Sequence, residues 1–153
     1  MTALRELSPD FREPLLAFAA EPVEFVIVGA DALALPGVAR FTGALDVFAR
    51  PSADNAERVW RSLVNFGAPV TAAGVHPADF AAPGIVYQIG LPPARIDILT
   101  AISGVTFDEA WASRETTDLE EAPIWFIGRA AFLRNKAAAG RPKDLADAAR
   151  LIP

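Results

Sequence analysis

Short apolar runs along the 153-residue chain alternate with amphipathic stretches and with segments rich in glycine and proline. A run of four or five mainly apolar residues between turn-forming residues is typical of a buried strand. Because several of these runs also hold branched or aromatic residues, five strands are predicted. They lie at 25–28, 45–48, 85–89, 95–99 and 124–127.

Apolar residues at helical spacing, bounded by caps and helix breakers, predict helices between these strands. Ser8-Pro9-Asp10 marks the start of a helix that runs to about Ala20, with Pro14 as a kink or restart. Further helices are expected at 32–35, 54–66, 107–114, 130–139 and 142–151, and residues 67–84 are expected to wind loosely. Strands and helices are interleaved, so we expect one α/β or α+β domain over 1–153, a mixed sheet flanked by helices.

Composition narrows the available chemistry. Apolar residues make up 52% of the chain and charged residues 22%, with no cysteine, one histidine and a net charge of −5. Thiolate and histidine-rich metal sites are therefore excluded, and nonspecific nucleic-acid binding is disfavoured. Carboxylates, hydroxyls, lysine and arginine remain, and an enzyme of this composition would hold magnesium on aspartates. No basic leader precedes an apolar run and no membrane-length apolar run occurs, so we expect a cytoplasmic protein.

Two aspartates interrupt predicted strands. Asp46 shares a strand face with Phe48, and Asp97 shares a face with Arg95 and Leu99. A charge in an apolar strand is costly unless it has a partner, so the two carboxylates are candidates for one metal site. The alternative is that each aspartate lies on an edge strand and faces water.

Two further segments are candidates for phosphate binding. In Val28-Gly29-Ala30 a strand ends in glycine before a predicted helix, whose free N–H groups can hold a phosphate. The alternative there is an ordinary turn. Lys136, Arg141 and Lys143 form a basic cluster, which either contacts phosphates or pairs with the nearby aspartates at 144 and 147. We interpret His76 as a loop residue and the three tryptophans, Trp60, Trp111 and Trp125, as core.

Four segments occur in an order that resembles a known family. They are Phe25–Ala30, Arg40–Asp46, Arg95–Leu99 and Lys136–Asp147. Together they resemble the minimal nucleotidyltransferases of the DNA polymerase beta superfamily, of the AbiEii toxin and toxin–antitoxin type. The resemblance covers roughly residues 15–151 and implies the nucleotidyltransferase fold.

The resemblance also implies a reaction and a site. It implies transfer of NMP from an NTP to a hydroxyl of an RNA or protein acceptor, with magnesium, and a toxin or antitoxin as a possible partner. Asp46 and Asp97 match the catalytic, metal-binding carboxylates. The implied nucleotide-binding residues are Gly29, Ala30, Arg40, Thr42 and Lys136. Apart from the resemblance, the basic residues Arg40, Arg95, Lys136, Arg141 and Lys143 are candidates for a positive cleft.

The chain departs from the family pattern at four positions in this site. Ala44 stands where the first metal-binding aspartate is expected, and Ala30 replaces the second glycine or serine. Asp31 adds a negative charge beside the triphosphate, and Pro36 replaces a frequent histidine. Three hypotheses follow: an active enzyme in which Asp31 substitutes for the missing carboxylate, a catalytically degenerate pseudoenzyme that serves as an antitoxin-like or other binding module, and a likeness of fold alone.

Overall fold

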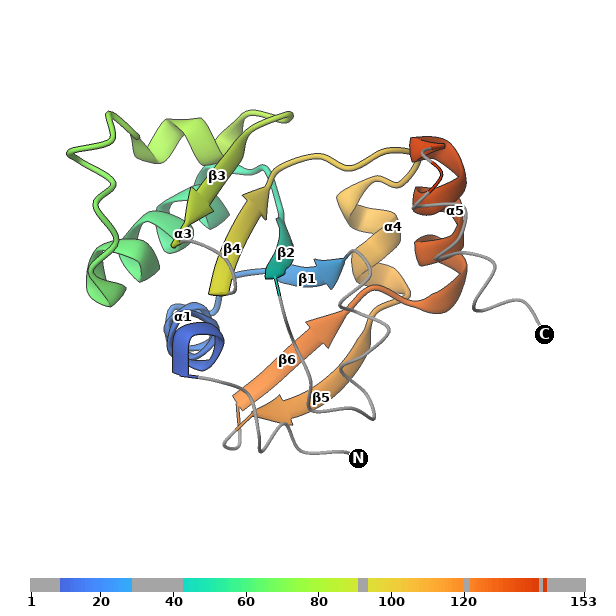
Figure 1. Cartoon of the computed structure of the whole chain (residues 1–153), viewed down its shortest axis with the longest axis horizontal. Helices are drawn as coiled ribbons and strands as arrows, with labels where there is room; N and C mark the ends of the chain where they lie inside the picture. The colour runs from blue at the N-terminus through green and yellow to red at the C-terminus, as the bar shows by residue number, and fades with distance from the viewer. Residues whose placement is uncertain (1–8, 29–42, 91–93, 120–121, 141, 143–153) are drawn as a thin grey trace.

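A six-stranded mixed sheet forms the centre of the protein, as seen in a computed structural model (Figure 1). The structure describes residues 9–28, 43–90, 94–119, 122–140 and 142. In these residues the strands are β1 (Phe25–Val28), β2 (Gly43–Ala49), β3 (Val86–Ile89), β4 (Ala94–Leu99), β5 (Glu115–Leu119) and β6 (Ala122–Phe126). Their spatial order is β3-β4-β2-β1-β6-β5. The β2–β4 and β1–β6 pairs are parallel and the others antiparallel, which confirms the predicted mixed α/β sheet.

Helices cover both faces of this sheet. The described helices are α1 (Pro9–Ala20), α3 (Ala53–Phe66), α4 (Phe107–Ala112), α5 (Arg129–Ala139) and the 3-10 helix η1 (Pro77–Ala81). Helix α1 contacts one face through Phe18, whose ring lies 5.6 Å from that of Phe25. Helix α4 contacts the other face through Phe107, whose ring lies 5.1 Å from that of Phe48. Since Phe25 and Phe48 occupy alternate positions in the β1–β2 register, the two helices lie on opposite faces.

Local sequence accounts for the position of α3. The Ser52 hydroxyl accepts a hydrogen bond from the Asn55 amide at its start, and Gly67 ends it with a φ of 96°. Val59 and Leu63, which share one face of the helix, are buried, whereas Phe66 in the last turn has an exposed fraction of 37%.

Helix α5 lies beside α4 (Figure 1). The Asn135 side chain donates a hydrogen bond to the Ser103 carbonyl at 2.9 Å, which ties α5 to the segment before α4. Gly104, with a φ of 74°, allows close approach here, because a Cβ atom on it would lie 2.6 Å from the Ala138 Cβ. Gly140 ends α5 as predicted, with a φ of 68°.

Two sequence expectations need correction, and a third falls outside the described residues. The polar segment 115–119, which the apolar pattern leaves unassigned, is the edge strand β5. Residues 67–84 are not wholly loose, since they contain η1 with the fully buried Phe80. The segment Pro142–Leu151 lies outside the described residues apart from Pro142. No helix in the described part of the chain is long and apolar enough to cross a membrane.

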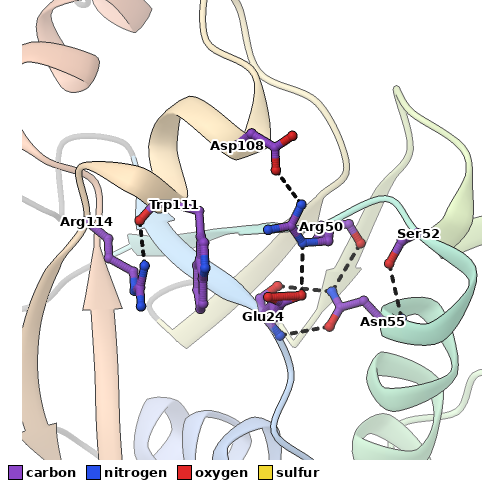
Figure 2. A network of polar contacts seen from close by, with 7 residues as sticks. All are labelled: Glu24, Arg50, Ser52, Asn55, Asp108, Trp111 and Arg114. Atoms are coloured by element: carbon purple, nitrogen blue, oxygen red, sulfur yellow. Dashed lines mark hydrogen bonds and ion pairs between the residues drawn. The ribbon is translucent and has the colours of Figure 1, made fainter.

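A buried asparagine fixes the junction of β1, β2 and α3 (Figure 2). Asn55 has no exposed surface, and its Oδ1 accepts from the Glu24 amide at 2.7 Å. Its Nδ2 donates to the carbonyls of Glu24 and Arg50 at 3.0 and 3.1 Å. The Arg50 guanidinium in turn pairs with Glu24 and Asp108 and lies 4.6 Å from the Phe107 ring centroid. This network holds α3 and α4 to the end of β2.

We predict that Asn55→Ala lowers the free energy of unfolding by about 2–3 kcal/mol, because it leaves the buried Glu24 amide without its acceptor and removes two further bonds. Urea unfolding followed by circular dichroism measures the change. The matched control is Asn65→Ala, since Asn65 is exposed and makes a single 3.4 Å hydrogen bond to Glu21. The control should cost less than about 0.5 kcal/mol. Equal losses in the two variants would contradict the account.

Candidate functional site on strands β2 and β4

The two predicted aspartates lie side by side at the centre of the sheet. Strands β2 and β4 are parallel neighbours, and their register pairs Asp46 with Asp97. Paired residues of adjacent strands share a face at a strand spacing of about 4.8 Å. The same row continues to Val28 on β1 and Gln88 on β3.

Neither aspartate lies on an edge strand. Strand β2 lies between β4 and β1, and β4 lies between β3 and β2, so the edge-strand alternative is wrong for both. Asp46 is half-buried, and the exposed fraction of Asp97 is 8%. Asp46 also shares its face with Phe48, against which α4 packs. The candidate site is therefore on the α4 side of the sheet, with little solvent at Asp97.

Arg95 forms a bidentate ion pair with Asp97. Its Nε donates to Oδ1 at 2.9 Å and its Nη2 donates to Oδ2 at 3.2 Å. The side chains retain 32% and 12% of their exposure, respectively. Residues two apart on a strand share a face, so the Arg95–Asp97 spacing explains the contact. Such a paired fork of hydrogen bonds to an ionised carboxylate is stronger than a neutral bond.

The described side chains do not fit a site for two metal ions. They contain no group of three or more His, Cys, Asp or Glu residues arranged to hold a metal. Position 44, where a further carboxylate is expected, carries alanine and pairs in register with Arg95. Both oxygens of Asp97 already accept hydrogen bonds from a guanidinium. The arrangement is that of an ion-paired carboxylate beside a second carboxylate.

The other predicted binding residues are distributed as follows. Gly29, Ala30, Arg40 and Thr42 lie outside the described residues, as do Asp31, Pro36, Arg141 and Lys143. Lys136 lies in the last turn of α5 with an exposed fraction of 6%, and its Nζ is 5.5 Å from the Phe132 ring centroid. The nucleotide contacts of Gly29, Ala30, Arg40, Thr42 and Lys136 remain predictions. His76 is an exposed loop residue whose amide donates to Asp79 before η1, in agreement with its interpretation.

Sequence patterns gave no indication of a second polar cluster. A shallow pocket of about 270 Å³ is lined by Arg50, Pro51, Ser52, Thr106, Phe107 and Asp108. Burial alone would lower the pKa of Arg50. The hydrogen bond to Asp108 and the negative charge of Glu24 outweigh burial and raise this pKa. Because two carboxylates already neutralise this guanidinium, the pocket offers little to an anion, and we assign it a structural role.

A stacked arginine lies beyond this pocket on the same side of the sheet (Figure 2). The Arg114 Cζ lies 3.8 Å from the Trp111 ring centroid and 5.7 Å from that of Trp125. Its Nη1 donates to the Trp111 carbonyl at 2.7 Å. Trp60, Trp111 and Trp125 all pack against the core, which confirms their interpretation. The exposure of each ring is only partial.

The chain matches no protein-family model and no curated protein. Its function is therefore argued from the geometry of the site.

We predict that Arg95→Met destabilises the fold by about 1–3 kcal/mol, because it leaves the Asp97 carboxylate buried without its cation. In the double variant Arg95→Met with Asp97→Leu, both charges are gone, so the loss should be smaller than in Arg95→Met alone. Urea unfolding of the two single variants and the double variant measures the coupling between the residues. Strictly additive losses would contradict the importance of this ion pair.

Proposed function

We propose that this chain is a nucleotidyltransferase-type domain that binds a nucleoside triphosphate at the Asp46–Asp97 face and has lost most or all of its NMP transfer. One observation carries the proposal: Asp46 and Asp97 occupy the same register position on adjacent parallel strands. The resemblance of the sequence requires two carboxylates to meet in this way from strands 51 residues apart along the chain. An unrelated strand order would have kept them apart.

The order of elements supports the same proposal. A strand that ends before Gly29, a second strand with Asp46 and a later strand with Asp97 follow one another as the resemblance implies. Residue 28, the last of β1, pairs with Asp46. The last described residue before the segment predicted to bind the phosphates is therefore the register partner of Asp46. A triphosphate held by that segment would be near Asp46.

Weakened catalysis follows from the composition of the site. In the family, magnesium polarises the α-phosphate and activates the attacking hydroxyl. Here the carboxylate expected at position 44 is absent and Asp97 is bonded to Arg95. Asp46 is the proposed residue that orients an acceptor hydroxyl or accepts its proton, and Arg40, Thr42 and Lys136 are the proposed contacts of the triphosphate. The acceptor would be a hydroxyl of RNA or of a protein.

We predict that the protein binds a fluorescent nucleoside triphosphate and that Arg40→Ala weakens this binding about tenfold, since a charge-assisted hydrogen bond is lost. Fluorescence anisotropy with labelled ATP, GTP, CTP and UTP measures the affinity. Arg61→Ala is the matched control, because Arg61 is an exposed arginine of α3 that pairs with Glu21. If no triphosphate binds, or if the control weakens binding equally, the proposed site is wrong.

We predict that the protein as it stands gives little or no NMP transfer and that Ala44→Asp combined with Ala30→Gly raises transfer at least about tenfold, by restoring a carboxylate and a phosphate-binding turn. Transfer of radiolabelled NMP to RNA and to protein acceptors measures the gain. Asp118→Asn in the same background is the control, because Asp118 lies on the far strand β5. Full transfer by the unaltered protein would show that catalysis was never lost.

A non-catalytic binding module, antitoxin-like or otherwise, is the second candidate. The Arg95–Asp97 ion pair favours it, because a carboxylate committed to a guanidinium serves the fold more than a reaction. A triphosphate that binds, together with a restored variant that still transfers nothing, would favour this candidate. Its partner would be a toxin or an antitoxin.

A further inference from the structure

The guanidinium of Arg95 contacts the carboxylate that the resemblance assigns to metal binding. It contacts both oxygens of Asp97 at 2.9 and 3.2 Å, from a position two residues earlier on the same strand. The Asp97 side chain retains only 12% of its exposure, so water compensates its charge poorly. A cation beside this carboxylate is therefore a requirement of the fold, and the chain supplies one itself.

The register brings the guanidinium and the missing carboxylate to one place. Arg95 pairs with position 44, where the resemblance expects a metal-binding aspartate and the chain has alanine. The next pair along the same face is Asp46 with Asp97. The two side chains start from strands about 4.8 Å apart, and two carboxylates at that separation would repel each other by about 3 kcal/mol at an effective dielectric constant of 20. Arg95 lies two residues before Asp97 on β4, and its positive charge offsets this repulsion.

The loss of the carboxylate at position 44 does not by itself exclude magnesium. Magnesium in proteins is commonly held by only one or two carboxylates, with water and substrate phosphates as its other ligands. Asp46 and Asp97 alone would meet that requirement. What sets this site apart is that the oxygens of Asp97 are already bonded to a guanidinium.

We propose that Arg95 is the resident cation of this site and that its ion pair with Asp97 excludes a divalent metal ion from the Asp46–Asp97 face. A metal ion at Asp97 would have to displace the guanidinium, or share the carboxylate with it against the repulsion of its positive charge. The proposal rests on the proposed function only for the identity of the excluded ion, magnesium. Arg95 thus acts as a positioning residue that keeps the site free of metal.

The test uses the full chain and manganese, a paramagnetic substitute for magnesium, without any nucleotide. Free Mn²⁺ is measured by electron paramagnetic resonance during titration of the unaltered protein, Arg95→Gln, Arg95→Lys and Arg95→Gln with Asp97→Asn. We expect Arg95→Gln to bind Mn²⁺ at least about tenfold more tightly than the unaltered protein, because its Asp97 carboxylate has lost its cation. Arg95→Lys keeps the charge and should stay within about threefold of the unaltered protein.

The double variant identifies the metal ligand. Arg95→Gln with Asp97→Asn should return to the weak binding of the unaltered protein, since the carboxylate itself is gone. Mn²⁺ binding by Arg95→Gln that is no tighter than that of the unaltered protein overturns the proposal, provided that circular dichroism shows both to be folded.

A second comparison does not depend on how well Arg95→Gln folds. The unaltered protein and Asp97→Asn should bind Mn²⁺ equally weakly, because Asp97 is not available to metal in either. A tenfold loss on Asp97→Asn would overturn the proposal. A failure of all nucleoside triphosphates to bind would instead contradict the proposed function and leave this result unchanged.

Discussion

The parallel register between β2 and β4 is the constraint on which the candidate site depends. It brings Asp46 to Asp97 and position 44 to Arg95, from segments far apart in sequence. The same register buries Leu45 and Val47 beside Ile96 and Ile98 on the opposite face. A slip of one residue would turn those four side chains to the α4 face and place the two aspartates on the opposite, wholly apolar face. The packing of apolar side chains on one face of the sheet therefore determines which polar residues lie side by side on the other face.

Burial then decides which charges the site can hold. Asp97 lies on an interior strand, where an ionised carboxylate is tolerated only with a compensating cation. In an enzyme that works with magnesium, the metal ion supplies that positive charge. Here the Arg95 guanidinium supplies the positive charge. Among the described residues, no third carboxylate joins Asp46 and Asp97 to form a metal-binding group. The fold is preserved by the same contact that removes Asp97 from metal chemistry.

The hydrophobic pattern predicts most of the sheet and the faces of its strands. The alternation around Asp46 and Asp97 correctly separates the charged face from the core face, because each strand is buried on the core side. The edge strand β5 escapes such a pattern, since only Thr117 and Leu119 of its five residues are buried and the others are polar or charged. Strand β5 is defined by its pairing with β6, which a local pattern does not contain.

The sequence predicts that Arg95 and Asp97 share a strand face, but it does not predict the polar junction around Asn55. Arg95 and Asp97 are two apart on a predicted strand and therefore share a face. Asn55 bonds to Glu24 across 31 residues, and its burial depends on how three elements meet. Tertiary contacts of this kind leave no periodic signal in the sequence.

The central claim is that Asp97 belongs to Arg95 and not to a metal ion. The most direct measurement is a crystal structure of the unaltered protein soaked in manganese, with anomalous diffraction to locate the ion. The account predicts Arg95 bonded to both oxygens of Asp97 and no anomalous peak between Asp46 and Asp97. A manganese ion bridging the two carboxylates, with the guanidinium turned away, would contradict it.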